Sequence, residues 1–94
     1  MMRVYLNRQT VSGMQDVYDL LAEGFCFPDY FGSNLDALFD CLTESTEERE
    51  IILSDRDYLK GTLGRKYAGL LHVINDAAEL SPNLKLYYAE GSEK

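Results

Sequence analysis

Three short apolar segments are separated by stretches with helical periodicity, and this alternation constrains the fold more than any other feature of the chain. The segments at 2–6, 51–53 and 84–88 have the length and composition of β-strands. Between them, apolar residues recur three and four positions apart, which is typical of amphipathic helices. Strands that alternate with helices form parallel sheets with right-handed crossover connections. The sequence therefore predicts an α/β fold, a small three-stranded parallel sheet with helices packed on it.

Small polar residues mark the expected starts of the first two helices. Ser12 and Gln15 have the spacing of a capping box, in which the two side chains satisfy exposed backbone donors of the first turn. Ser33 and Asp36 repeat this spacing ahead of the next apolar stripe. We therefore expect one helix just after Ser12 and another just after Ser33, with the loop 25–32 between them.

Two glycines in the second half of the chain indicate where a helix begins. Gly61 and Gly64 are expected to break the chain ahead of a helix over 65–79. The triplet 51–53 is apolar throughout, which suits a buried strand. Because no repeat, low-complexity tract or linker interrupts the sequence, residues 1–94 are expected to form one domain.

The acidic residues are concentrated in one part of the chain. The 94 residues carry a formal net charge of −7, and between Asp16 and Asp57 twelve acids face only two basic residues, a local balance of −10. This excess argues against a nucleic-acid binder and against docking on an anionic membrane, since both need Lys and Arg to meet phosphate. A one-sided field can instead attract and orient a basic partner. The alternative, a solvated face that keeps a small protein soluble, stays open.

The sequence also bears on location and thiol chemistry. The first residues lack the apolar stretch of a signal peptide, and no later run is long enough to span a bilayer. The chain has two cysteines, Cys26 and Cys41, which are too few for the set of disulfides that stabilises small secreted proteins. We therefore expect a cytoplasmic protein, while the pairing of the two cysteines stays open.

Candidates for catalysis are few. His72 is the single histidine, and it lies in a predicted helix with no obvious local partner. Cys26 and Cys41 have neither redox nor zinc-binding spacing. Asp36 and Asp40 could hold Mg²⁺ between them, but two carboxylates four residues apart are a weak signal for a magnesium-dependent enzyme. We therefore expect no enzymatic activity, no cofactor and no metal.

The stretch 25–43 is the most informative part of the sequence. Four of the eleven aromatic residues lie in its loop: Phe25, Phe27, Tyr30 and Phe31. In the helix that follows, leucines share one face (Leu35, Leu38, Leu42), polar residues share the opposite face (Asp36, Asp40, Thr43), and Phe39 lies on the border. Aromatic residues beside uncompensated charge are typical of protein-binding hot spots. The pattern indicates an interaction surface for a basic target, with an ordinary acidic solvent face as the alternative.

The same stretch resembles a known family. From Pro28 to Thr43 the sequence is Pro-Asp-Tyr-Phe-Gly-Ser-Asn-Leu-Asp-Ala-Leu-Phe-Asp-Cys-Leu-Thr, which is similar to the signature segment of barstar, the intracellular inhibitor of barnase-type ribonucleases. Chain length, element order and the last apolar strand agree as well, so the resemblance extends over the whole chain. It implies a barstar-like fold and a function as a ribonuclease inhibitor.

The resemblance also implies which residues meet the partner. Residues at matching positions would contact the nuclease or shape the contact surface: Tyr30, Gly32, Asn34, Asp36, Phe39, Asp40, Thr43 and, on the last helix, Asp76. Gly32 and Asn34 would form the turn into the helix. A carboxylate at Asp40 would take the place of a substrate phosphate and accept charge-assisted hydrogen bonds from the nuclease. The free inhibitor is expected to be a monomer.

Three departures from the family pattern leave the target open. Phe39 stands where the family has tryptophan, Glu44 where barstar has glycine, and Leu80 where barstar has a second acid one turn beyond Asp76. The expected partner is a basic ribonuclease of the extracellular type or a related nuclease toxin. The alternative is a barstar-like immunity or interaction module for a different basic partner, either another nuclease or a protein that is not a nuclease.

Overall fold

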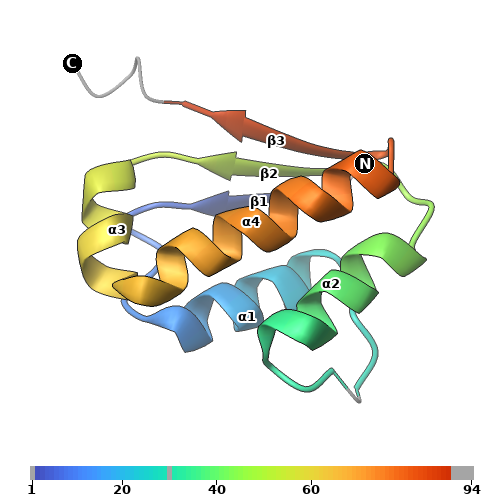
Figure 1. Ribbon diagram of the computed structural model, residues 1–94, viewed down its shortest axis with the longest axis horizontal. Helices are drawn as coiled ribbons and strands as arrows, with labels where there is room; N and C mark the ends of the chain where they lie inside the picture. Colours follow the sequence, from blue (N-terminus) through green and yellow to red (C-terminus); the bar gives the residue numbers. More distant parts are fainter. Residues whose placement is uncertain (1, 30, 90–94) are drawn as a thin grey trace.

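A computed structural model of the chain describes residues 2–29 and 31–89 (Figure 1). The elements follow the order β1 (Met2–Leu6), α1 (Met14–Gly24), α2 (Leu35–Glu44), β2 (Arg49–Leu53), α3 (Arg56–Leu63), α4 (Arg65–Leu80) and β3 (Leu84–Tyr88). The strands form a sheet in the order β1-β2-β3, and both pairs are parallel. The predicted α/β fold with a three-stranded parallel sheet is confirmed.

One face of the sheet is covered by helices and the other is open. Along β2, Arg49, Ile51 and Leu53 are buried, whereas Glu50 and Ile52 alternate with them and are only partly covered. Successive side chains of a strand point to opposite faces of the sheet, so the open face is the one that carries Ile52. The expectation of a wholly buried triplet at 51–53 was therefore wrong for its middle residue. In Figure 1, α4 crosses the strands on the covered face, with α1 and α2 beside it.

The core lies between the covered face and the helices. Its fully buried side chains come from the sheet and from all four helices: Leu6, Val17, Leu21, Leu38, Leu42, Ile51, Leu53, Leu59, Leu70, Ile74 and Ala77. Leu38 and Leu42 on α2 point inward as expected from their spacing, while Leu35 is only partly buried. The leucine stripe thus sets the orientation of α2, because it places the acidic stripe of the same helix toward solvent.

The helix starts differ from the predicted capping boxes. Asn34, not Ser33, caps α2, and its Oδ1 accepts a hydrogen bond of 2.7 Å from the backbone N–H of Ala37. Ser33 has a φ of 51° instead. At α1 the N-cap is Gly13, with no side-chain bond. Asparagine and serine are equally good caps, so local spacing alone could not choose between neighbouring positions.

Asp16 rather than Gln15 is the partner of Ser12. Both the backbone N–H and the hydroxyl of Ser12 donate to Asp16 Oδ2, at 2.8 and 2.7 Å. Hydrogen bonds of this kind favour the ionised carboxylate, so they hold the pKa of Asp16 below its ordinary value. Gln15 instead donates to Asp19 at 3.0 Å. The capping interaction predicted at Gln15 is therefore supplied one residue later.

The helix α3 was not expected from the sequence. Gly61 lies inside it rather than breaking the chain, although a glycine within a helix costs about 1 kcal/mol relative to alanine. Burial of Leu59 and Leu63 on one face and a 2.7 Å hydrogen bond from the Tyr58 hydroxyl to the Val11 carbonyl fix the helix in place. Gly64, with a φ of 61°, makes the turn between α3 and α4.

Replacing Gly24 with alanine is expected to destabilise the fold by about 1–3 kcal/mol, because overpacking forces neighbouring groups to move. A Cβ at Gly24 would collide with Val4 Cγ2 in β1. Gly61→Ala is the matched control, since a Cβ there meets nothing within 4 Å and should stabilise α3. Urea unfolding of both variants measures the two effects. Equal shifts in the same direction would contradict the packing of α1 on β1.

Candidate partner-binding groove

A groove of about 500 Å³ runs between α2 and α4. Its lining comes from four residues of α2 and two of α4: Leu35, Asp36, Phe39, Asp40, Val73 and Asp76. The two helices lie close, since a Cβ at Gly69 of α4 would be 3.0 Å from Leu35 Cδ1. The groove thus has an apolar floor and three carboxylates at its rim.

The structure brings four of the predicted site residues together. Asp36 and Asp40 are exposed on the outer face of α2, and Phe39 between them is half-buried against the core. Asp76, a predicted contact residue from a distant part of the sequence, lines the same groove from α4. Sequence analysis missed two lining residues: Leu35, which it placed on the leucine face of its helix, and Val73, to which it gave no role.

Three other predicted residues, Gly32, Asn34 and Thr43, are not part of the groove lining. The Thr43 hydroxyl donates to the carbonyl oxygens of Phe39 (2.9 Å) and Asp40 (3.2 Å) within α2. Asn34 caps the helix and its Nδ2 donates to the Gly32 carbonyl at 3.3 Å, so both shape the turn into α2. Tyr30 lies outside the described residues.

His72 has a partner that sequence analysis did not find. Its Nε2 lies 3.2 Å from Asp76 Oδ2, one helical turn further along α4, and both side chains are largely exposed. The contact places an imidazole at the α4 rim of the groove. A cation that approaches Asp76 would therefore meet His72 as a competitor for the same carboxylate.

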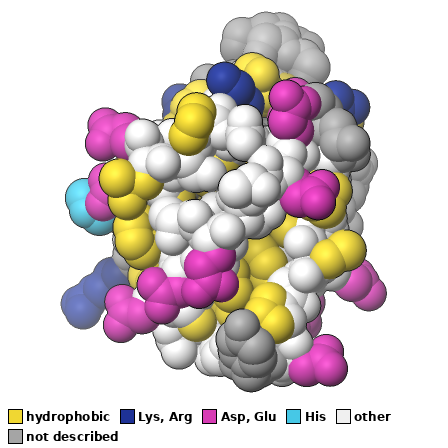
Figure 2. All heavy atoms as spheres, turned by 90° about the vertical axis from the view of Figure 1, so that its right-hand side faces the viewer, with side chains coloured by type: hydrophobic (Ala, Val, Ile, Leu, Met, Phe, Trp, Pro, Cys, Tyr) yellow, Lys and Arg dark blue, Asp and Glu magenta, His cyan; other side chains and the backbone are white. Residues whose placement is uncertain are grey.

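Acidic side chains are scattered over the face of the molecule shown in Figure 2, which is otherwise mostly apolar or uncharged, while Lys and Arg lie toward its margins. Apolar side chains lie among the acids on the same face. Among the ion pairs of residues 2–29 and 31–89, none involves Asp36 or Asp40. Two of the three groove carboxylates, Asp36 and Asp40, therefore have no basic partner within the described chain, whereas Asp76 lies against His72.

A family model described as Barstar (barnase inhibitor) matches residues 1–88. This chain belongs to the barstar family. A relative in Bacillus subtilis (strain 168), named "Putative ribonuclease inhibitor YrdF", is 31% identical to it over 80 residues, which is 84% of this chain and 88% of the relative. The resemblance seen in the segment 28–43 is thus confirmed at the level of the family.

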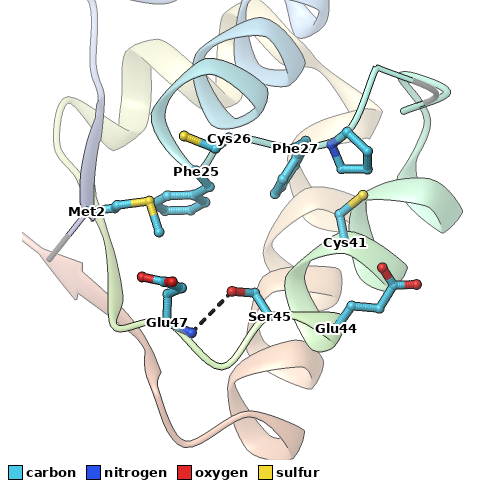
Figure 3. A pocket seen from close by; sticks show the side chains of 9 residues that line it. Met2, Phe25, Cys26, Phe27, Cys41, Glu44, Ser45 and Glu47 are labelled. Atoms are coloured by element: carbon cyan, nitrogen blue, oxygen red, sulfur yellow. Dashed lines mark hydrogen bonds between the residues drawn. The ribbon is translucent and has the colours of Figure 1, made fainter.

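A second cavity in this barstar-family chain lies between the loop after α1 and the end of α2 (Figure 3). It has a volume of about 460 Å³ and contains the two cysteines, Cys26 and Cys41, among its lining residues. Both thiols are free, Cys26 exposed and Cys41 buried. Figure 3 shows the Cys26 sulfur pointing away from Cys41, with the Phe27 ring between the two residues.

Cys26 is expected to react with a thiol reagent much faster than Cys41 in the native protein. Burial raises the pKa of the Cys41 thiol, and the neighbouring charges of Glu44 and Asp40 raise it further. Ellman's reagent should therefore modify one thiol per chain rapidly, and both in urea. Cys26→Ser should remove the rapid phase. Two equally fast thiols would contradict the burial of Cys41.

Two further properties concern the described residues alone. Within 2–29 and 31–89, no three or more His, Cys, Asp or Glu side chains are grouped so as to hold a metal ion. None of the helices in this part of the chain combines the length and apolar character needed to cross a membrane.

Proposed function

We propose that this chain inhibits a ribonuclease by inserting α2 and the rim of α4 into the basic active site of the enzyme. The observation that carries the proposal is the convergence of Asp36, Asp40 and Asp76 around Phe39 in one groove. The relative's name as a ribonuclease inhibitor and membership of the barstar family support it. The chain would act by occlusion, without chemistry of its own.

The carboxylates supply the charge that a nuclease site recognises. Ribonucleases hold Lys, Arg and His to bind phosphate and to stabilise the charge of the transition state. A carboxylate at that place accepts charge-assisted hydrogen bonds, bidentate where the donor is arginine. Asp40 is the proposed central anchor and Asp36 its flank, since both project from the outer face of one helix. Asp76 would add a third anion from α4.

The aromatic residues would exclude water from these contacts. Phe39 is half-buried and packs on the core, so it presents a pre-ordered apolar surface between the two aspartates. Tyr30, outside the described residues, is proposed to add a second aromatic contact. Apolar groups around a charged contact keep it dry, which strengthens the hydrogen bonds within it.

The proposed target is a barnase-type ribonuclease or a related nuclease toxin. Leu80 is 68% exposed at the end of α4, at the position where barstar has an acid. This end of the surface therefore offers the target an apolar side chain instead of a charge. A nuclease with an apolar patch beside its basic site would fit this chain better than one with a cation there.

Titration of a barnase-type ribonuclease with the protein tests the proposal directly. We expect activity to fall linearly to zero at one inhibitor per enzyme, with a complex of matching mass in solution. A folded sample that neither inhibits nor binds such ribonucleases or related nuclease toxins would contradict the proposed function.

Salt is expected to weaken the complex mainly through slower association. The acidic surface around the groove would steer a basic enzyme toward it, and screening removes this attraction. Raising ionic strength from low to several hundred millimolar should reduce the association rate constant roughly tenfold or more, with little change in dissociation. Stopped-flow measurements separate the two rates. A salt-independent association rate would argue against electrostatic steering.

A further inference from the structure

Within residues 2–29 and 31–89, no other strand bonds to the backbone groups on the outer edge of β3. The N–H of Arg49 donates to the Asn83 carbonyl, and the N–H of Ala89 to the Leu53 carbonyl. Alternate residues of a parallel strand bond to the same neighbour, so the odd-numbered residues of β3 face β2. Leu84, Leu86 and Tyr88 therefore direct their backbone groups away from the sheet. Of these, the N–H of Leu84 already donates to the Ser81 carbonyl.

Exposed apolar side chains gather along the same edge. Four large apolar residues are exposed among those described, and three of them belong to β3 or to the end of the helix before it: Leu80 (68%), Tyr87 (47%) and Tyr88 (44%). The opposite edge, at β1, is partly covered, since the Thr10 hydroxyl donates to the Tyr5 carbonyl at 3.0 Å. The β3 edge is thus the more open of the two.

We propose that β3 is a self-association surface, on which a second copy of this chain adds its own β3 in antiparallel orientation about a twofold axis at Leu86. In this register the outward-facing residues oppose each other, Leu86 to the partner's Leu86 and Leu84 to the partner's Tyr88. The N–H groups of Leu86 and Tyr88 then donate to the carbonyls of Leu86 and Leu84 of the other copy. The two sheets become one sheet of six strands.

Side-chain charge favours this register over one of its neighbours. With Leu86 on the axis, Lys85 lies opposite the partner's Tyr87, where an ammonium group can pack over the aromatic ring. A slip that set Leu84 opposite Leu86 would place Lys85 opposite the partner's Lys85, and like charges directly opposite are destabilising. The strand has only five residues, so the dimer should be weak and dependent on concentration.

Measurement of the molar mass in solution, by sedimentation or light scattering from micromolar to millimolar concentration, tests the inference. The mass of the unmodified chain should rise from 10.7 kDa toward twice that value. Tyr87→Lys sets lysine opposite the partner's Lys85 on both sides of the axis and should raise the dissociation constant about tenfold or more. Adding Lys85→Glu to that variant should restore the dimer.

Tyr5→Lys is the matched control, because Tyr5 lies in the same row of the open face, 50% exposed, but on β1. It should associate like the unmodified chain. Circular dichroism verifies that each variant folds. A monomer at every concentration would overturn the inference. The β3 edge would then pair with an extended segment of another protein or with no partner at all. Loss of the dimer in Tyr5→Lys to the same extent as in Tyr87→Lys would also overturn it, since the contact would then be the open face.

The inference differs from the monomer expected from the sequence, and it is independent of the proposed inhibition. The groove is formed by α2 and α4, and its lining includes no residue of β3. Tyr87→Lys should therefore inhibit a target nuclease as well as the unmodified chain does, even though its self-association is lost.

Discussion

Replacing Asp40 with alanine is expected to weaken binding to the target nuclease by about 2–5 kcal/mol, which is roughly 30-fold to several thousand-fold in the dissociation constant. The proposed contact pairs this carboxylate with cations of a dry enzyme site, and its removal leaves those cations without a partner. Most of the loss should appear as faster dissociation. Inhibition assays and surface-based kinetics with the variant measure it.

The same substitution should leave the free protein as stable as before or slightly more stable. Asp36 and Asp40 lie four residues apart on one helix, where two like charges cost about 0.2–0.5 kcal/mol. Opposite effects on binding and on folding distinguish a binding residue from a structural one. Glu48→Ala is the control, because Glu48 is an exposed acid outside the groove. Equal losses of affinity in both variants would indicate a general field instead of an anchor at Asp40.

Replacing Arg49 with alanine is expected to destabilise the fold by about 2–5 kcal/mol, through loss of packing and of buried hydrogen bonds. Arg49 lies in β2 with 1% of its surface exposed. Its Nε donates to the Glu47 carbonyl at 3.0 Å, and its Nη2 to the Ser45 carbonyl and to the Ser81 hydroxyl, both at 3.3 Å. The guanidinium therefore ties the end of α2 to the turn after α4.

Burial of the Arg49 guanidinium has two unfavourable consequences, a lowered pKa and an unpaired donor. Burial lowers the pKa of Arg49, although arginine stays protonated. Its Nη1 has no hydrogen-bond partner among the described residues, and its guanidinium packs 5.8 Å from the centre of the Phe25 ring. Both Arg49→Met and Arg49→Ala remove the unpaired donor, but Arg49→Met should cost less because methionine keeps most of the buried volume.

Arg3→Ala is the matched control for Arg49. Arg3 forms a 2.7 Å ion pair with Glu50 on the open face of the sheet and is half exposed, and exposed pairs of this kind contribute little. Urea unfolding of the variants at Arg3 and Arg49 compares the two positions. Equal destabilisation at both would contradict the burial of Arg49 and the role given to it here.

Helical and strand periodicity were sufficient to predict much of the fold. The strands at both ends of the chain, the helices α1 and α4, and the inward leucines of α2 follow from patterns within a few residues. The same local pattern placed Asp36 and Asp40 on the outer face of α2. The prediction failed locally at the two helix starts. At α2, Ser33 and Asn34 are equally good capping residues, so the pattern could not choose between them. At α1, the N-cap is Gly13, and Ser12 bonds to Asp16 instead.

Tertiary packing decided the rest. The helix α3 forms despite Gly61 because burial of Leu59 and Leu63 outweighs a weak local propensity. Burial of Arg49 depends partly on the hydroxyl of Ser81, which lies far away in the sequence and reaches Arg49 through the turn after α4. A charged residue beside apolar ones in the sequence gives no local indication that it will be buried. Ile52 faces the open side because the helices cover only one face of the sheet.

For the candidate groove, too, the sequence determined one part and the tertiary structure the other. The sequence by itself determined one wall, the acidic and aromatic stripe of α2, because a helix of known register fixes which side chains share a face. The opposite wall, with Val73 and Asp76, exists only once α4 lies against α2. Residues more than thirty positions apart meet through the crossing of two helices, and no periodicity within either helix specifies that crossing.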